Sequence, residues 1–203
     1  SRTIRTMSSG ELSQLRRLYS VDATEGEYLG YIERKTASLM SACCEVGAIA
    51  GGASDSKRRR LALFGWNIGM AYQIADDITD MIGNVEDEGK PSGSDLRAGL
   101  VTLPVVRLLS DSAWVEKVQR LWDGEDSPEG GAAEILRGVR ETGCLTYAAE
   151  VARRYCRDAL RCLQSFPAAP ETDMLGSAVS LVDLRCDVPC LQCPDRSQEP
   201  ADS

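Results

Sequence analysis

Apolar side chains recur at every third or fourth residue along residues 24–52 and again along residues 55–83, which is the period of one face of an α-helix. The first segment starts with Thr24 and Glu27 at the spacing of a helix capping box, and the second ends at Gly83, a residue suited to a left-handed cap. The face of the first segment consists of Leu29, Ile32, Thr36, Leu39, Cys43, Val46 and Ile49. No stretch of useful length alternates with the two-residue period of a strand. The pattern therefore predicts long neighbouring helices and an all-α fold.

Residues 84–99 are polar and rich in glycine, which predicts a loop after the second long helix. Further helices are predicted over residues 102–110, 113–122, 128–141, 144–165 and 171–184. With 203 residues, of which 43% are hydrophobic, the chain is long enough for one domain with one core. We expect that domain to cover residues 1–187 and a disordered tail to follow at residues 188–203.

The charge of the chain excludes some classes of function. A net charge of −8 argues against a nucleic-acid surface, because binding the phosphate backbone needs clustered Lys and Arg. The dense basic run at residues 57–60 is interpreted as a solvated face of the second long helix. No run of eighteen apolar residues is present, so no transmembrane segment is expected. The N-terminus has neither an apolar signal region nor an initiating Met, so we expect the chain to be part of something longer.

The chain contains eight cysteines and no histidine. Five of the cysteines lie in predicted helices: Cys43, Cys44, Cys144, Cys156 and Cys162. We interpret these five as reduced core thiols, which suits a cytoplasmic location. Cys186, Cys190 and Cys193 could hold a metal or belong to a disordered tail. The absence of a nearby fourth Cys or His favours the tail.

Three aspartates lie close together in the second long helix. On a helix, Asp76 and Asp80 share one face, while Asp77 points about 100° away from Asp76. Two carboxylates on one face of a largely apolar helix call for a cation, and Mg²⁺ accepts one or two carboxylates together with water and phosphate. A solvated acidic helix end, or pairing with Arg side chains from elsewhere, would also explain them.

Basic residues flank the aspartates on both sides in the sequence. Lys90 and Arg97 lie among glycines in the following loop, where a lysine could reach a metal-bound phosphate. Lys35 interrupts an apolar part of the first long helix and could instead be a surface lysine that extends its amine into water. These residues form one phosphate site if the fold brings them together.

Two segments resemble a known family. "YQIADDITDMIGNVEDEGKPSGSDLRAGLVTLP" resembles the second aspartate-rich region of the trans-polyprenyl diphosphate synthases, and "YIERKTASLMSACCEVGAIAGG" resembles the Lys-Thr helix of the same family. "MSSGEL" is similar to the Gly-Glu stretch upstream of that helix. The order and separations agree to about residue 187. The resemblance implies a class I terpenoid synthase-like helical bundle, truncated at the N-terminal side.

The resemblance also implies a reaction and a set of site residues. Family members condense an allylic diphosphate with isopentenyl diphosphate in a Mg²⁺-dependent reaction. By matching position, Mg²⁺ is assigned to Asp76 as a direct ligand and to Asp77 and Asp80 either directly or through metal-bound water. Contacts with the allylic substrate are assigned to Lys35, Thr36, Gln73 and Lys90, with the two lysines as the catalytic groups.

The sequence departs from the family pattern at two places. Many members carry a lysine at the position of Leu100, so one positive charge is missing. The family's first aspartate-rich motif, which precedes the segment present here, has no counterpart in this sequence. We therefore expect no condensation by the chain alone.

Three interpretations remain open. The chain is part of a full synthase, or it is a non-catalytic subunit that pairs with a catalytic homologue, or it is a relative of the terpene cyclases. The Lys-Thr helix and "GKPSGSDL" fit the chain-elongating branch better than the cyclases. The resemblance suggests a homodimer, or a heterodimer with a full-length homologue.

Overall fold

The structure, a computed structural model, describes residues 2–82 and 92–188. Its helices are α1 (Arg2–Leu15), α2 (Glu25–Ile32), the π-helix η1 (Glu33–Ala37), α3 (Ser38–Ala50), α4 (Asp55–Ile82), α6 (Ser94–Arg97), α7 (Leu103–Leu108), α8 (Ser112–Trp122), α9 (Pro128–Glu141), α10 (Cys144–Leu163) and α11 (Pro170–Leu184). These ranges contain no strand, so the all-α prediction is confirmed. The helices predicted beyond the loop are present, with ends that differ by two residues or fewer.

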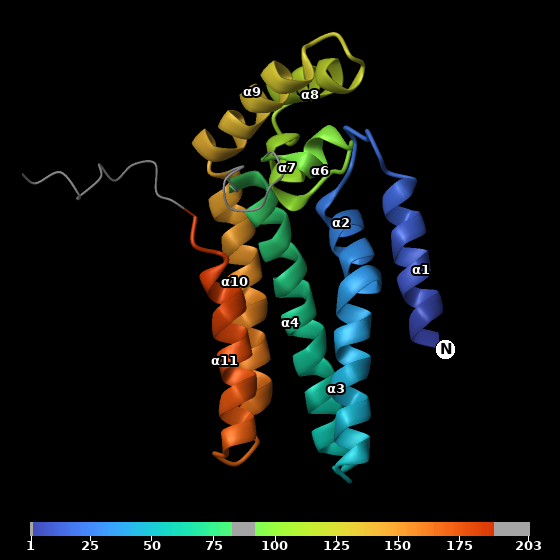
Figure 1. Cartoon of the computed structure of the whole chain (residues 1–203), viewed down its shortest axis with the longest axis vertical. Helices are drawn as coiled ribbons and strands as arrows, with labels where there is room; N and C mark the ends of the chain where they lie inside the picture. The colour runs from blue at the N-terminus through green and yellow to red at the C-terminus, as the bar shows by residue number, and fades with distance from the viewer. Residues whose placement is uncertain (1, 83–91, 189–203) are drawn as a thin grey trace, which may run out of the picture.

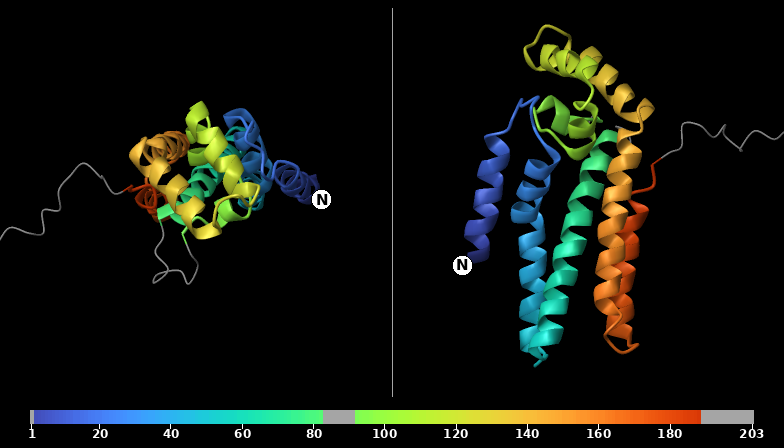
Figure 2. Two further views of the ribbon diagram at one scale, coloured as in Figure 1. Left: turned by 90° about the horizontal axis from the view of Figure 1, so that it is seen from above. Right: turned by 180° about the vertical axis from the view of Figure 1, so that it is seen from behind.

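The long helices form a bundle with α4 at its centre (Figure 1). The continuous rod of α2, η1 and α3 runs antiparallel to α4 on one side, and α10 packs along α4 on the other. Outside these lie α1, next to η1, and α11, next to α10. The short helices α6 to α9 cover the end of the bundle at which α4 finishes (Figure 2).

The first long rod begins as the sequence predicts. Thr24 caps α2 through its side chain, and the Glu27 side chain returns a bond to the Thr24 backbone, which completes the capping box. At Glu33, however, the rod widens into η1, which local spacing did not indicate. A π-turn shifts the residues after it around the helix axis, and such turns are frequent at functional sites.

Glycines allow the rod and α4 to pack closely. A Cβ added to Gly69 would lie 2.6 Å from the Cα of Ala37, and one added to Gly65 would overlap the carbonyl oxygen of Met40. Glycine lowers helix propensity and is usually tolerated inside a helix where a neighbouring backbone or a ligand comes close, and at Gly65 and Gly69 it is a backbone. The close packing brings η1 and the aspartate-rich part of α4 into direct contact.

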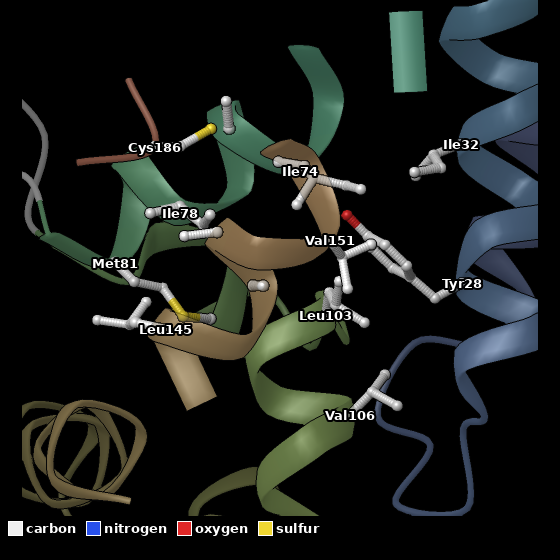
Figure 3. Packing of buried hydrophobic residues seen from close by; sticks show 14 of the residues in the cluster. Tyr28, Ile32, Ile74, Ile78, Met81, Leu103, Val106, Leu145, Val151 and Cys186 are labelled. Atoms are coloured by element: carbon white, nitrogen blue, oxygen red, sulfur yellow. The ribbon is translucent and has the colours of Figure 1, made fainter. Parts of the chain in front are cut away.

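The core lies where the long helices meet the cap (Figure 3). Ile74, Ile78 and Met81 of α4 are almost fully buried there. They meet Tyr28 and Ile32 of α2, Leu103 of α7 and Leu145 of α10. Burial of one such side chain stabilises the fold by about 1.5–3 kcal/mol. The aspartate-rich end of α4 is therefore held by packing on several sides.

Two elements differ from the prediction. Residues 2–15 form α1, which was not predicted because its polar residues and Ser-Ser-Gly sequence give a weak apolar pattern. Within the predicted loop, residues 94–97 form α6, a single turn held by contacts with α4 and α9 that are distant in sequence. Gly83 and Lys90 lie outside the described residues.

The apolar face predicted for the first rod is buried only in part. Ile32 is fully buried, whereas Leu39, Val46 and Ile49 of α3 are 42%, 63% and 55% exposed. Within the described residues, α3 packs against α1, η1 and α4 and leaves this face uncovered. Cys43 lies on the same face and is exposed, so its interpretation as a core thiol is wrong.

The other cysteines among the described residues differ in burial, and one of them differs from the prediction. Cys144, Cys156 and Cys162 are buried, as expected, and Cys44 is half-buried. Cys186 is also buried: its thiol donates to the carbonyl of Val182, 3.4 Å away. Its placement in a disordered tail is therefore wrong, because the last turn of the bundle encloses it. Cys190 and Cys193 lie outside the described residues.

Burial keeps the Cys186 thiol protonated. It raises the pKa of Cys186 to about 11 and that of Cys156 to about 12. No helix in residues 2–82 or 92–188 has the length and apolar character needed to cross a membrane.

Candidate functional site

The three aspartates at the end of α4 lie in three different surroundings. Asp77 is 3% exposed and faces α2. Asp76 is exposed on the side of α11, and Asp80 is half-buried against the first turn of α6. The step of about 100° between neighbouring helix residues separates Asp77 from Asp76. Asp76 and Asp80 are one turn apart on the same face, and they differ because Arg185 after α11 reaches the first and the start of α6 reaches the second. Each carboxylate consequently has its own set of partners.

Asp77 is held by two hydrogen bonds in the interior. The Tyr28 hydroxyl donates to Asp77 Oδ2 at 2.6 Å, and Gln73 Nε2 donates to Asp77 Oδ1 at 3.0 Å. Burial raises the pKa of Asp77 to about 7, although both hydrogen bonds act in the opposite direction. Sequence analysis did not identify Tyr28, because no spacing rule links residues that are 49 positions apart.

A further hydrogen bond connects this pair to η1. The Thr36 hydroxyl donates to Gln73 Oε1 at 2.7 Å, so the amide of Gln73 joins Thr36 to Asp77. Three residues assigned to the site from the sequence therefore form one chain, with Tyr28 at its end. We call this Thr36–Gln73–Asp77–Tyr28 chain the buried relay. It fixes the orientation of the Gln73 amide, because each end of that amide has a partner of the right kind.

Lys35 faces α1 rather than the aspartates. Its amine donates to Gln14 Oε1 at 3.0 Å and lies 3.5 Å from Glu11 Oε1. The close approach of the two helices requires Gly10, since a Cβ there would lie 2.6 Å from the Lys35 backbone nitrogen. The Lys35 side chain is 29% exposed, so its amine is half-enclosed rather than extended into solvent.

Asp80 organises the segment after α4. Its Oδ1 accepts from the Ser94 hydroxyl at 2.5 Å and the Ser94 backbone at 3.2 Å, and its Oδ2 accepts from the Asp95 backbone at 3.2 Å. Both carboxylate oxygens are therefore engaged at the start of α6. Arg97 of the same turn donates to the carbonyl of Ser92. Lys90 belongs to the part of this segment that lies outside the described residues.

Asp76 pairs with an arginine from the far end of the chain. Arg185 Nη2 lies 3.1 Å from Asp76 Oδ1, and the same guanidinium lies 5.4 Å from the ring centre of Tyr72. The Asp76 side chain is 50% exposed, so water weakens the pair. Pairing with an arginine from elsewhere is one of the explanations that the sequence left open. It holds for Asp76 in the absence of a metal.

The donor chemistry at Asp76 suits a hard cation. Mg²⁺ needs one or two carboxylates and completes its shell with water and phosphate. Asp76 is solvent-accessible, and its Oδ2 accepts no hydrogen bond in residues 2–82 and 92–188. Among these residues, no group of three or more Asp, Glu, Cys or His side chains is arranged as a complete metal site. Asp76 therefore has the exposure and the free oxygen that one ligand of such a cation needs.

The helical bundle has the fold of the prenyl diphosphate synthases. It superposes on the crystal structure of a decaprenyl diphosphate synthase from Rhodobacter capsulatus with a TM-score of 0.84 and 29% identity, covering 92% of this chain and 58% of that chain. It is equally similar to the polyprenyl synthase from Caulobacter crescentus CB15 complexed with calcium and isoprenyl diphosphate, with a TM-score of 0.83 and 30% identity. That match covers 90% of this chain and 56% of the other.

The amino-acid sequence identifies the family of this chain more narrowly than the fold does. It belongs to the polyprenyl synthetase family, whose sequence model matches residues 1–136. A curated relative, component 2 of the heptaprenyl diphosphate synthase of Geobacillus stearothermophilus, is 36% identical over 167 residues. The aligned region covers 82% of this chain and 52% of the relative, so the chain spans about half the length of that protein. The family resemblance inferred from the aspartate-rich and Lys-Thr segments is confirmed.

Proposed function

We propose that the chain binds the diphosphate of an allylic prenyl substrate together with Mg²⁺, as the allylic-substrate part of a prenyltransferase that uses isopentenyl diphosphate as the second substrate. The buried relay is the observation that carries this proposal. It joins the Lys-Thr segment of η1 to the aspartate-rich end of α4 through residues that the family assigns to the substrate. The Thr36 and Gln73 side chains are only partly buried, so this end of the chain is accessible to a bound substrate.

The residues of the site take different roles in this proposal. Asp76 is the direct metal ligand, since it is the carboxylate of the three that water reaches freely. Asp77 and Asp80 already accept protein hydrogen bonds on both oxygens, so they act through metal-bound water or by holding the site in shape. Lys35 and Lys90 supply positive charge to the diphosphate, which requires the Lys35 amine to turn away from Gln14 and Glu11. Thr36 and Gln73, which lie side by side on η1 and α4, contact the substrate.

Bound Mg²⁺ would neutralise the diphosphate and make it a better leaving group. The chain itself supplies the surroundings of the carbocation that remains. Packing of the apolar α4 side chains against the neighbouring helices keeps water out of the interior behind the site, which limits the access of water to the cation. The buried relay holds the hydroxyls of Thr36 and Tyr28 and the amide of Gln73 in fixed orientations. These dipoles therefore do not have to reorient during the reaction.

We expect no condensation by this chain alone. The sequence contains one aspartate-rich motif, whereas the family uses two sets of carboxylates. Purified chain with Mg²⁺, geranyl diphosphate and radiolabelled isopentenyl diphosphate should form no radiolabelled prenyl product. Robust turnover would contradict this expectation.

Binding can be tested without turnover. Isothermal titration with geranyl S-thiolodiphosphate, an unreactive allylic analogue, should show Mg²⁺-dependent binding. Asp76→Asn should weaken it by about tenfold or more, because a metal ligand is lost. Asp173→Asn is the control. Asp173 is exposed on α11, so this substitution removes the same charge far from the site. Equal effects of the two substitutions would exclude Asp76 as the metal ligand.

A second candidate function is that of a partner subunit. The name of the Geobacillus relative describes it as one component of a synthase, which favours a heteromeric assembly for this chain as well. Mixing the chain with a full-length homologue should then give a stable complex in size-exclusion chromatography and alter the length of its product. The buried thiols described above fit a cytoplasmic location, which we include in the proposal.

A further inference from the structure

Tyr19 has a backbone conformation that residues with a side chain rarely adopt. Among the described residues it is the only one other than glycine with a positive φ, which is 62°. This left-handed region is strained for a bulky residue, and such strain persists only where the surroundings hold the residue in place. Tyr19 lies in the connection between α1 and α2 and takes no part in the buried relay. Its conformation therefore needs a reason of its own.

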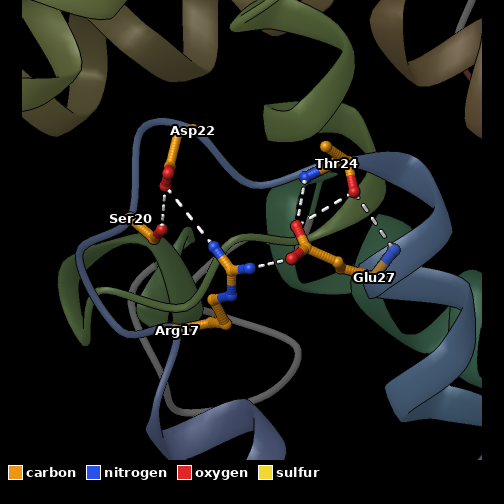
Figure 4. A network of polar contacts seen from close by, with 5 residues as sticks. All are labelled: Arg17, Ser20, Asp22, Thr24 and Glu27. Atoms are coloured by element: carbon orange, nitrogen blue, oxygen red, sulfur yellow. Dashed lines mark hydrogen bonds and ion pairs between the residues drawn. The ribbon is translucent and has the colours of Figure 1, made fainter.

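Polar contacts hold the connection on both sides of Tyr19 (Figure 4). Arg17 pairs with Asp22 and with Glu27. The Ser20 hydroxyl donates to Asp22 as well. Arg17 thus joins the chain before Tyr19 to the first turn of α2, which gives Tyr19 a fixed place in the fold.

Both the backbone and the ring of Tyr19 contact Gly99, which follows α6. The Tyr19 N–H donates to the Gly99 carbonyl at 2.8 Å. A Cβ added to Gly99 would lie 2.4 Å from Cε1 of the Tyr19 ring, and the φ of Gly99, 77°, also favours glycine. The ring therefore lies directly on the backbone at Gly99, at a distance that no other residue there would permit.

The same ring meets Trp122 of α8. The two ring centres are 5.8 Å apart in an edge-to-face arrangement, which is a favourable one for aromatic pairs. Trp122 Nε1 in turn donates to the carbonyl of Leu96 at 2.9 Å. Tyr19 and Trp122 thus hold the end of α6 through Gly99 and Leu96. We call Tyr19, Gly99 and Trp122 the aromatic clamp.

The aromatic clamp and Asp80 hold opposite ends of α6. A helix of four residues has no stability of its own, because its first turn fixes several residues for very few hydrogen bonds. At its start, the backbone N–H groups of Ser94 and Asp95 donate to Asp80. Leu96 anchors the middle of α6 in the core, so loss of the clamp should loosen this turn rather than release it. A loosened turn would no longer fix the donors to Asp80.

We propose that Tyr19 is a positioning residue: through the aromatic clamp it fixes α6, and α6 fixes the Asp80 carboxylate at the diphosphate site. This inference rests on the proposed function, in which Asp80 acts through metal-bound water or by holding the site in shape. The strain at Tyr19 is then offset by the contacts that its ring makes with Gly99 and Trp122.

Hydrogen exchange tests the clamp without metal or substrate. Tyr19→Asn removes the ring and keeps the backbone conformation, because Asn is among the residues that best tolerate a positive φ. Since Tyr19 is 53% exposed, its loss should leave the core intact. The amides of Ser94 and Asp95 should exchange at least about fivefold faster in this variant than in the unmodified chain.

Two further variants serve as controls for the exchange rates. Tyr19→Phe keeps the ring and should exchange as the unmodified chain does, because the Tyr19 hydroxyl makes no hydrogen bond in the described residues. Leu15→Asn removes a side chain that is 58% exposed at the end of α1, and it should also leave the Ser94 and Asp95 amides unchanged.

A double-mutant cycle tests whether Tyr19 acts through Asp80. In Mg²⁺, Tyr19→Asn should weaken the binding of geranyl S-thiolodiphosphate about fivefold. Combined with Asp80→Asn it should cause little further loss, whereas the losses of Tyr19→Asn and Asp76→Asn should multiply. A residue that only stabilises the fold would multiply with both.

Three results would overturn the inference: unchanged exchange in Tyr19→Asn, an equal change in Leu15→Asn, or independent losses in Tyr19→Asn and Asp80→Asn. Absence of Mg²⁺-dependent binding by the unmodified chain would instead count against the proposed function. The exchange rates would then still decide whether Tyr19 holds the contacts of Asp80.

Discussion

Asp76 and Asp77 are neighbours in the chain, but their side chains lie in different surroundings. Asp76 is half-exposed and pairs with Arg185, while Asp77 is buried and accepts from Tyr28 and Gln73. A single residue step on a helix turns one carboxylate toward water and the next into the core. The same residue type can thus serve as a ligand at one position and as a structural acceptor at the next.

Tyr28→Phe should test the structural part of the buried relay. The substitution keeps the ring and removes the donor to Asp77, so we expect a loss of about 1–3 kcal/mol in the free energy of unfolding, measured with urea. Tyr72→Phe is the control, because Tyr72 is 37% exposed and its hydroxyl makes no hydrogen bond in the described residues. Equal stabilities of the two variants would show that the Tyr28 hydroxyl contributes nothing.

The pKa of Asp77 predicts a pH dependence of stability. In the unfolded chain this carboxyl has its ordinary pKa of 3.8, and burial raises its pKa to about 7 in the folded protein. Between these values the folded state binds more protons, so the contribution of Asp77 to stability falls as the pH rises from about 4 to about 7.

Asp77→Asn isolates this contribution from all other titrating groups. The difference in unfolding free energy between the unmodified chain and the variant should change between pH 5 and pH 8, with the unmodified chain relatively less stable at pH 8. A difference that is constant with pH would show that the pKa of Asp77 is the same in the folded and unfolded states.

At the scale of the elements, the contact between α4 and η1 sets the geometry of the site. Gly69→Ala places a Cβ against the Ala37 backbone, so we expect a destabilisation of about 1–3 kcal/mol from overpacking. Gly47→Ala in α3 is the matched control, because its Cβ would meet nothing within 4 Å. It should stabilise the chain by up to about 1 kcal/mol through helix propensity. Thermal unfolding of both variants measures the difference, and a stabilised Gly69→Ala would contradict the close packing.

The end of α11 places a positive charge over the carboxylate proposed to bind metal. Because Arg185 and Mg²⁺ would compete for Asp76, Arg185→Gln should raise the affinity for Mg²⁺ several-fold more than Arg59→Gln does. The stability of the chain should change by about 1 kcal/mol or less, as for other exposed ion pairs. Mn²⁺ replaces Mg²⁺ as a paramagnetic probe, and its electron paramagnetic resonance signal during titration gives the affinity. Equal effects of the two substitutions would indicate a general charge effect.

The whole molecule leaves an apolar face of α3 uncovered within the described residues. Leu39, Val46 and Ile49 are its exposed members. Such a face binds apolar dyes and promotes association. Val46→Glu should therefore reduce the fluorescence of a bound naphthalene sulfonate dye and the concentration-dependent increase in sedimentation rate. Ser56→Glu, an exposed polar position, adds the same charge and should leave both unchanged.

Much of this protein follows from local sequence. Helical periods, the Thr24 capping box and the position of three aspartates near the end of α4 depend on the backbone geometry of a few consecutive residues, and each could be predicted. A close approach at Gly65 and Gly69 could also be expected, because glycine lowers helix propensity, but whether a backbone or a ligand makes that approach could not be predicted.

The tertiary structure decided which partner each of these residues has. The Tyr28 hydroxyl on Asp77, Arg185 on Asp76, the burial of Cys186 and the exposure of Val46 all depend on packing between helices that are far apart in the sequence. A helical period identifies an apolar face but contains no information on whether another helix covers it. The sequence by itself thus determined the long helices and the family of this chain, and the packing of those helices determined how its carboxylates, arginines and thiols can be used.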